Sequence, residues 1–432
     1  MAVATAVSPV AEVCRSAKRA ARELARADSE LKDAGLERIA EALEDRVQEI
    51  LEANERDMQA GVEAEVGEAL LDRLRLDHAR VATVAGAVRR IAALADPVGE
   101  VIEGRRLPNG LDVRRVRVPL GVVAVVYEAR PNVTIDAAAL CLKSGNAIVL
   151  RGSSLAAHSN AILAQLASEA VVAAGLPEGS VSLVAGGGRE ELAELATQKD
   201  TVDLIIPRGG ESLKEALQAV ATVPVIYAAS GNCHIYVDAS ADLDQAASIV
   251  MNAKTQRPGV CNATETLLVH RDVASLFLPE MLRTLVGAGV LIRADERTLE
   301  LLAARSQAGD MVGMAVEEAS EQDWSTEYLD LTLAVRVVDG VEEAIEHIAR
   351  YGSGHSEAIL TRDVAAARAF QLGVDAACVY VNASTRFTDG GEFGMGAEIG
   401  NSTQKLHARG PIGLRELCSF KYLVEGDGHV RD

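Results

Sequence analysis

Residues 118–152 read VPLGVVAVVYEARPNVTIDAAALCLKSGNAIVLRG, and this stretch decides the fold class. Its apolar run GVVAVVYEA is typical of a strand that is buried on both faces of a sheet. A helix-like stretch, AAALCLKSG, follows it, and AIVL indicates a second, shorter strand. Because strand, helix and strand alternate here, the stretch predicts a parallel, doubly wound α/β sheet.

The surrounding chain extends this pattern in both directions. Upstream, from about Ser8 to Leu94, apolar residues recur at helical spacing. Downstream, SVSLVAG and VDLIIPRGG add strands to the first sheet, and a second α/β series begins after about Asn252. Between the helices and the first strand, residues 105–118 carry the turn signal Pro-Asn-Gly and an alternating, arginine-rich run. We therefore expect two α/β domains and a projecting β-hairpin.

Composition restricts the class of function. The chain has 432 residues, a net charge of −20 and 49% hydrophobic residues, so it is a globular protein without the basic face of a nucleic-acid binder. Its six cysteines are scattered without a Cys-x-x-Cys pair, and the histidines lack metal-ligand spacing, so we expect neither a disulfide framework nor a metal. We see no signal peptide and no apolar run of about 20 residues, and we expect a cytoplasmic protein that does not enter a membrane.

Two strand ends carry residues that suit a nucleotide cofactor. The first reads Arg151-Gly152-Ser153-Ser154 and the second Pro207-Arg208-Gly209-Gly210. Parallel sheets bind nucleotides at the carboxyl ends of their strands, although no G-x-G-x-x-G fingerprint is present here. The first end holds an arginine and serines but no acid, which suits the 2′-phosphate of NADP(H). The alternative, a solvated loop arginine, stays open on this pattern alone.

Cys261 is the candidate nucleophile. It lies in AKTQRPGVCNATE, where Pro258-Gly259 predicts an irregular turn between a helix and a strand. Lys254 and Arg257 are nearby cations that favour a thiolate. The alternative is that Cys261, like most lone cysteines, is a buried apolar residue.

Three further residues are weaker candidates. Asn132, after the first buried strand, can point its amide into a cleft as an oxyanion donor, or it can simply be the N-cap of the next helix. Glu392 and Phe393 lie in a glycine-rich segment and can contact a ribose and a nicotinamide face. For these two the alternative is an ordinary cluster of turns.

Long stretches of the chain resemble the gamma-glutamyl phosphate reductase family of the aldehyde dehydrogenase superfamily. Besides residues 118–152, the matching stretches include DLIIPRGG, SGNCHIYVD, NAKTQRPGVCNATETLLVH and VYVNASTRFTDGGEFGMGAEIG. They run from about Val118 to Leu414, and the upstream helices match as well, so the resemblance covers nearly the whole chain.

The resemblance implies a role for each candidate residue. Cys261 is the nucleophile, and Asn132 is the oxyanion donor. Arg151 and Ser153 hold the adenosine ribose of NADP(H), and Glu392 and Phe393 contact the nicotinamide ribose. The loop near the cofactor pyrophosphate consists of Pro207, Arg208, Gly209 and Gly210.

The resemblance also implies an NADPH-dependent reduction of L-glutamyl 5-phosphate to L-glutamate 5-semialdehyde and phosphate through a cysteine thioester, the second step of proline biosynthesis. We expect residues 1–104 and 119–251 to form the NADP-binding domain, and residues 252–385 to form the catalytic domain. Residues 386–414 would return to the cofactor cleft, while 105–118 and 415–425 would be oligomerisation strands of a homo-oligomer. Glutamate 5-kinase is a partner to consider.

One departure from the wider superfamily bears on the reaction. Hydrolytic members use a glutamate to activate water, whereas residues 229–234 read Ala-Ser-Gly-Asn-Cys-His, without a carboxylate. This favours phosphate over water as the group that exchanges with the thioester. Two rival hypotheses remain: another thioester-forming dehydrogenase that uses a CoA ester or a different acyl phosphate, and a binding protein on the same fold.

Overall fold

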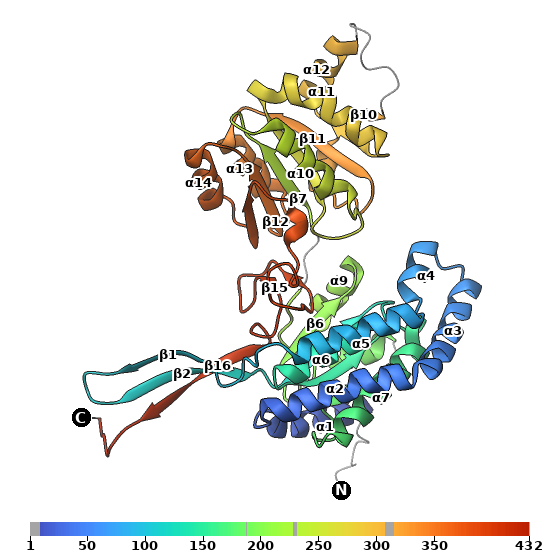
Figure 1. Ribbon diagram of the computed structural model, residues 1–432, viewed down its shortest axis with the longest axis vertical. Helices are drawn as coiled ribbons and strands as arrows, with labels where there is room; N and C mark the ends of the chain where they lie inside the picture. The colour runs from blue at the N-terminus through green and yellow to red at the C-terminus, as the bar shows by residue number, and fades with distance from the viewer. Residues whose placement is uncertain (1–8, 187, 228–230, 307–314, 432) are drawn as a thin grey trace. The chain divides into compact units, whose positions relative to one another are not determined.

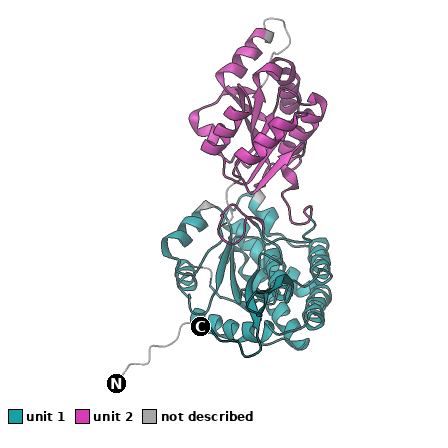
Figure 2. Cartoon of the chain, turned by 90° about the vertical axis from the view of Figure 1, so that its left-hand side faces the viewer, with its two compact units in different colours: residues 1–228, 394–400, 412–432 teal, residues 229–393, 401–411 magenta. Residues whose placement is uncertain are grey.

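The computed structural model describes residues 9–186, 188–227, 231–306 and 315–431. The chain forms two compact units, coloured separately in Figure 2. Unit 1 contains residues 1–228, 394–400 and 412–432, and unit 2 contains residues 229–393 and 401–411. Among the described residues, no helix has the length and apolar character needed to cross a membrane.

Unit 1 begins with five helices, as the helical spacing upstream of the hairpin predicts (Figure 1). They are α1 (Pro9–Leu24), α2 (Ser29–Asp45), α3 (Val47–Glu63), α4 (Glu68–Leu74) and α5 (His78–Ala92). Side chains fix where two of them start, because Asp28 accepts a hydrogen bond from the backbone N–H of Leu31 and Asp77 from that of Arg80.

The parallel sheet of unit 1 has the strand order β5-β4-β3-β6. The predicted unit of strand, helix and strand is present as β3 (Val122–Tyr127), α6 (Asn132–Lys143) and β4 (Ala147–Arg151). Every residue of β3 and β4 is buried, in agreement with their apolar sequences. The remaining elements are η1 (Ser154–Ala156), α7 (Ala157–Ala173), β5 (Val181–Leu183), α8 (Arg189–Ala196), β6 (Leu204–Arg208) and α9 (Glu211–Val220).

The predicted hairpin is present and gains a third strand from the end of the chain. β1 (Val101–Arg106) pairs antiparallel with β2 (Asp112–Pro119), and β2 pairs antiparallel with β16 (Cys418–Glu425). Gly110 in the connecting turn has φ of 91°, a conformation that glycine adopts at no steric cost. Figure 1 shows the three strands as a ribbon that projects from the helices of unit 1.

Unit 2 contains a seven-stranded sheet with the order β10-β9-β11-β8-β7-β12-β13. The first half of unit 2 comprises β7 (Cys233–Val237), α10 (Leu243–Thr255), β8 (Thr264–His270), α11 (Arg271–Gly287), β9 (Leu291–Ala294), α12 (Glu296–Ser306), β10 (Val316–Glu318) and η2 (Glu321–Ser325). The second half of unit 2 comprises β11 (Thr332–Val338), α13 (Val341–Tyr351), β12 (Ser356–Leu360), α14 (Val364–Gly373), β13 (Cys378–Val381), η3 (Thr385–Phe387), β14 (Asn401–Ser402) and β15 (Gly410–Pro411). β14 and β15 pair with each other in a separate two-stranded sheet.

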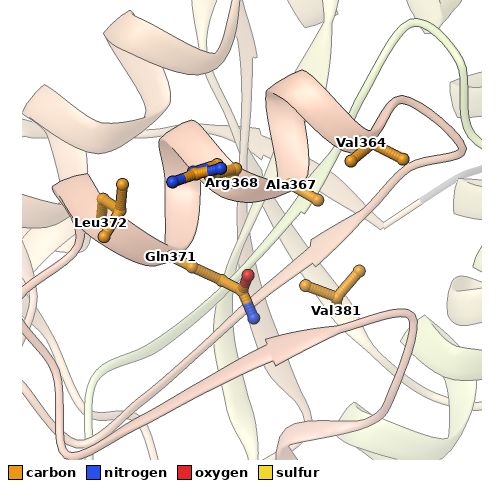
Figure 3. Close-up of a pocket in the computed structure, with 6 residues that line it drawn as sticks. All are labelled: Val364, Ala367, Arg368, Gln371, Leu372 and Val381. Carbon is orange, nitrogen blue, oxygen red and sulfur yellow. The ribbon is translucent and has the colours of Figure 1, made fainter.

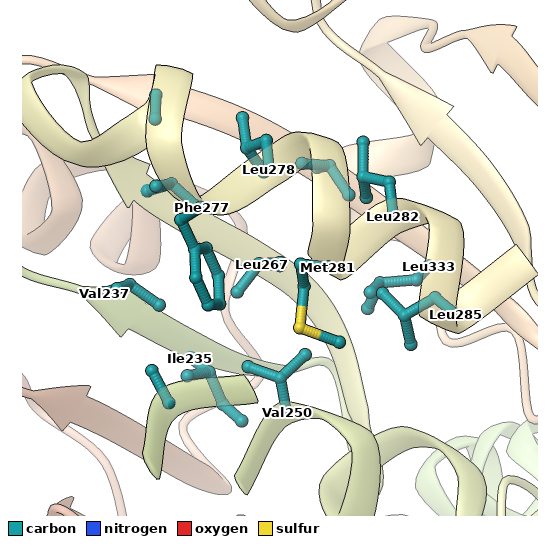
Figure 4. Close-up of a cluster of buried hydrophobic side chains, with 14 of the residues drawn as sticks. Ile235, Val237, Val250, Leu267, Phe277, Leu278, Met281, Leu282, Leu285 and Leu333 are labelled. Atoms are coloured by element: carbon teal, nitrogen blue, oxygen red, sulfur yellow. The ribbon is translucent and has the colours of Figure 1, made fainter. Parts of the chain in front are cut away.

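The sheet of unit 2 has a hydrophobic core on each face. Successive side chains of a strand point to opposite faces, so Ile235 joins the cluster under α10 and α11, whereas Tyr236 joins the cluster with α13 and α14. Figure 4 shows the first cluster, where Phe277 and Met281 of α11 face Val250 of α10. Because it is packed on both faces, the sheet gives a rigid support to β8, which begins just after the candidate nucleophile.

The boundary between the units differs from the expected one. The expectation placed it after residue 251, whereas the chain passes from unit 1 to unit 2 after residue 228. The physical reason is that β7 pairs in parallel with β8 and β12, so that β7 and α10 belong to the second sheet. The expected return segment 386–414 is also divided, because residues 394–400 pack with unit 1 and residues 401–411 with unit 2.

Candidate active site

Cys261 lies in the predicted turn between α10 and β8. Of the six cysteines, five are buried and Cys261 is partly exposed. The turn is tied down by Asn262, whose side-chain amide donates to the carbonyl oxygen of Thr388 at 2.9 Å. Thr385 donates from its hydroxyl to the carbonyl oxygen of Asn262 at 2.7 Å. An accessible thiol on a fixed turn suits a nucleophile better than a core residue.

The backbone of Cys261 is also held from the start of β7. A Cβ atom added to Gly231 would lie 1.6 Å from the carbonyl oxygen of Cys261, so only glycine allows this close approach. The Cys233 thiol donates to the same carbonyl at 3.2 Å. Gly231 and Cys233 belong to the segment in which we expected no carboxylate; its first two residues, Ala229 and Ser230, lie outside the described residues.

Glu327 is a carboxylate that the sequence analysis missed. Its Oε1 atom accepts a hydrogen bond from the backbone N–H of Gly231 at 2.7 Å and thereby supports the segment before β7 that packs on Cys261. Gly231 and Glu327 are 96 positions apart in the sequence. The signal for this contact would have been an acidic residue in the loop before β11. Two residues later, Leu329 has φ of 54°, which marks this loop as conformationally constrained.

Lys254 does not serve as a free cation beside Cys261. It is fully buried, and its ammonium group lies 2.5 Å from Oε2 of Glu265, which is buried as well. Burial lowers the pKa of Lys254 and raises the pKa of Glu265 to about 7, while the mutual attraction of the pair opposes both shifts. The backbone N–H of Leu329 donates to the other oxygen of Glu265 at 3.2 Å. The pair therefore joins α10, β8 and the loop before β11.

Removing Lys254 is expected to destabilise the protein. In Lys254→Met, Glu265 stays buried without its partner, which typically costs about 3–5 kcal/mol. The loss should grow as pH rises, because an unpartnered buried carboxyl has a folded-state pKa above its unfolded value and folding then requires a proton. Denaturant unfolding at several pH values measures both effects. The matched control is Lys405→Met, since Lys405 and Asp375 form an exposed pair and should contribute little. Equal stability of the two variants would contradict the structural role of Lys254.

The two strand ends predicted to bind a nucleotide lie at one edge of the sheet in unit 1. β3 separates them, with Val126 paired to Arg151 and Tyr127 paired to Arg208. Gly210 is the N-cap of α9, and its N–H donates to Oε2 of Glu128 at 3.2 Å. Gly400 of the return segment packs against Arg208, because a Cβ at Gly400 would lie 2.7 Å from its Nη1 atom. This edge has the parallel strand ends and helix N-terminus that a nicotinamide dinucleotide requires.

Arg151 is part of a small cluster at this edge. It is buried, and its Nη2 atom donates to the carbonyl oxygen of Gly188 at 2.6 Å. Burial lowers the pKa of Arg151, and the charge of Glu191 opposes that shift. A Cβ at Gly188 would lie 2.6 Å from Oε2 of Glu191, so this carboxylate lies against the glycine loop. Ser153 caps η1 by accepting from the N–H of Leu155.

Asn132 is the first residue of α6 and not its N-cap, which is Pro131. The amide nitrogen of Asn132 donates to Oδ2 of Asp136 at 2.9 Å. Burial raises the pKa of Asp136 to about 6. Because the amide carries two N–H groups, one is oriented by Asp136 and the other can serve a ligand.

The remaining candidates lie in different surroundings. Glu392 and Phe393 belong to unit 2 and are exposed, with the ring of Phe393 6.4 Å from that of Tyr380. Lys143, the last residue of α6, is buried and paired with Asp33, so it has a structural role. The pocket in Figure 3 lies beside α14 and contains none of the predicted site residues. Its lining consists of Val364, Ala367, Arg368, Gln371, Leu372 and Val381.

Comparisons with known proteins agree with this picture. The aldehyde dehydrogenase family matches residues 2–323. The chain is 53% identical to gamma-glutamyl phosphate reductase from Thermobifida fusca, over 98% of both chains. It is 55% identical to gamma-glutamyl phosphate reductase from Moorella thermoacetica, over 96% of this chain and 97% of that one. The crystal structure of gamma-glutamyl phosphate reductase from Thermotoga maritima superposes with a TM-score of 0.94 at 46% identity, covering 98% of this chain and all of the other.

Proposed function

Because the chain belongs to the gamma-glutamyl phosphate reductases of the aldehyde dehydrogenase family, we propose that it reduces L-glutamyl 5-phosphate to L-glutamate 5-semialdehyde and phosphate. It is an oxidoreductase of that family and acts on a small molecule. The observation that carries the proposal is the partly exposed Cys261 on a turn fixed from two sides, by Asn262 and by Gly231. This reaction is the second step of proline biosynthesis from glutamate.

The chemistry assigned to Cys261 is nucleophilic catalysis. Its thiolate attacks the acyl carbon, a C–S bond forms, and the C–O bond to phosphate breaks. A bound nicotinamide supplies the hydride that reduces the resulting thioester. The thiohemiacetal on Cys261 then collapses, returns the thiolate and releases the semialdehyde, which can cyclise on its own amine. Asn132 and the backbone N–H of Cys261 are proposed to stabilise the oxyanion in both acyl steps.

The choice of acyl acceptor tests this function directly. In the reverse direction, we expect glutamate semialdehyde and NADP⁺ to give NADPH when phosphate is present, and not when CoA replaces it. Absorbance of the reduced nicotinamide measures both reactions. Turnover with CoA, or turnover without any acceptor, would overturn the proposed reaction in favour of a CoA-acylating or a hydrolytic enzyme.

A nicotinamide cofactor follows from the family, and NADP(H) is the finer proposal. The arginine and serines at the end of β4 support NADP(H), because Arg151 and Ser153 suit a 2′-phosphate. Pro207, Arg208, Gly209 and Gly210 are proposed to face the pyrophosphate. Glu392 and Phe393 are proposed, from the family resemblance, to contact the nicotinamide ribose and ring.

Two substitutions test how the charges of Arg151 and Glu191 affect the choice between NADPH and NADH. Arg151→Gln should weaken NADPH binding roughly ten- to hundredfold, since it removes a charged partner of the 2′-phosphate, and should leave NADH binding nearly unchanged. Glu191→Gln should act in the opposite direction and strengthen NADPH binding, because it removes a carboxylate that interacts with Arg151. Fluorescence titrations with both cofactors measure these changes. A parallel loss of NADPH and NADH affinity in Arg151→Gln would assign Arg151 to the loop structure alone.

The β1-β2-β16 sheet is the proposed contact of a homo-oligomer. Its last strand exposes apolar side chains on a projecting ribbon, with Phe420 at 48%, Tyr422 at 57% and Val424 at 55% exposed. Exposed aromatic side chains on a free sheet favour association with another chain. A cytoplasmic location and an encounter with glutamate 5-kinase, which would supply the labile acyl phosphate, rest on the family resemblance alone.

A further inference from the structure

A second arginine lies against the turn that carries Cys261. Arg386 belongs to η3, and its guanidinium donates through Nε to Oε1 of Gln256 at 2.9 Å and through Nη1 to Oδ1 of Asn262. Asn262 follows Cys261 directly, so these two hydrogen bonds join η3 to both sides of the turn. The guanidinium is thus fixed beside the nucleophile by amide oxygens, which are neutral and do not form an ion pair with it.

Charges of both signs surround Arg386. Burial lowers the pKa of Arg386, and the positive charge of Arg257 adds to that shift, while Asp389 and the Cys261 thiolate oppose it. Arg257 is exposed and lies on the same turn as Cys261. In the described part of the chain, neither arginine is within 4.0 Å of a carboxylate oxygen. Arg386, held by Gln256 and Asn262, and the exposed Arg257 therefore place two positive charges on the turn of the nucleophile, where an anion can bind.

We propose that Arg386 and Arg257 bind the phosphoryl group of the substrate and stabilise the phosphate as it leaves. This inference rests on the proposed function. In an acyl phosphate the phosphorus is two bonds from the carbon that Cys261 attacks, whereas the α-carboxylate lies at the far end of the carbon chain. A guanidinium held next to the nucleophile is therefore placed for the phosphoryl group, whose oxygens match its planar set of donors.

The charge balance of the reaction supports this assignment. When the C–S bond forms, the electron pair of the breaking C–O bond moves onto the phosphate oxygen and raises the negative charge of the leaving group. The two positive charges stabilise that change, and in the reverse direction they hold inorganic phosphate against the thioester. Arg386 is the more constrained of the two and should contribute more.

Steady-state kinetics of the reverse reaction, with inorganic phosphate as the varied substrate, test the proposal. Arg386→Gln and Arg386→Lys should raise the KM for phosphate by roughly tenfold or more, and Arg257→Gln by several-fold. The KM values for the semialdehyde and NADP⁺ should stay within about twofold of the wild-type values. The matched control is Arg350→Gln, because Arg350 forms an exposed ion pair with Glu321 in the same unit.

Alkylation of the thiol gives a readout that needs no turnover. Because Cys261 is the accessible cysteine, the wild-type protein should react faster with anionic iodoacetate, relative to neutral iodoacetamide, than Arg386→Gln does. Inorganic phosphate should slow alkylation of the wild-type protein and have a weaker effect on the variant. Circular dichroism and thermal unfolding check that the variants fold. Because the side chain of Arg257 is exposed, Arg257→Gln should fold normally, so at least this variant reports on binding and not on misfolding.

The possible outcomes distinguish a failure of the proposed phosphate site from a failure of the proposed reaction. If the variants raise the KM for the semialdehyde and leave that for phosphate unchanged, the arginines bind the α-carboxylate and the proposal is wrong. Unchanged kinetics together with unchanged alkylation ratios would also overturn it. A wild-type protein that shows no phosphate-dependent turnover would instead refute the proposed function itself.

Discussion

Replacing Cys261 with serine is expected to abolish the phosphate-dependent reduction of NADP⁺ by glutamate semialdehyde. A serine hydroxyl at the same position lacks the thiolate that forms the acyl intermediate, and no neighbouring group is assigned to activate it. Loss of a nucleophile typically lowers turnover by roughly 10⁴-fold or more. Initial rates of NADPH formation at saturating phosphate measure the effect.

The control for this variant is Cys14→Ala. Cys14 is fully buried in α1 of unit 1, and burial raises the pKa of its thiol to about 11, so it carries no thiolate near neutral pH. That variant should keep its activity once its folding has been verified. Retention of substantial phosphate-dependent activity by Cys261→Ser would remove Cys261 from the mechanism.

Replacing Asn132 with alanine is expected to lower kcat by about 10²–10³-fold with a small change in KM, the effect of losing one oxyanion donor. The reason is that Asp136 orients one N–H of the amide, and the other N–H is proposed to donate to the oxyanion. Asp136→Asn removes the orienting carboxylate and keeps the donor, so its kcat should fall much less. Single-turnover rates of thioester formation measure the chemical step in both variants.

Two results would contradict the assignment of Asn132. A rise in KM without a change in kcat would indicate that the residue binds substrate uniformly. An unchanged kcat together with a lower stability would return Asn132 to a purely structural role at the start of α6.

The sequence predicts elements better than it predicts their neighbours. The apolar runs in residues 118–152 are sufficient to identify β3 and β4, because strands buried on both faces tolerate few polar residues. The apolar strand β7 is equally compatible with either sheet. Its membership depends on pairing with β8 and β12, the latter more than 100 residues away, and this is why the boundary between the units lies at residue 228 and not at residue 251.

The same distinction applies to the site. The turn signal around Pro258 and Gly259 locates Cys261, since local turn chemistry is readable from neighbouring residues. Gly231 and Arg386 contact the turn from distant segments, and Glu327 supports Gly231 from another. Charge alone makes Arg386 a candidate for substrate binding, but no local pattern places any of the three beside Cys261. Lys254 illustrates the opposite error, because its nearness in sequence to Cys261 says nothing about Glu265, which neutralises it inside the core.

The central claim is that Cys261 carries the glutamyl group as a thioester. Incubating the protein with glutamate semialdehyde and NADP⁺ in the absence of phosphate should trap this intermediate, because its acceptor is missing. Intact-protein and peptide mass spectrometry should then show one added glutamyl group on the peptide that contains Cys261, and its loss when phosphate is added. An adduct on a different residue, or no adduct in a protein that turns over when phosphate is present, would contradict the account.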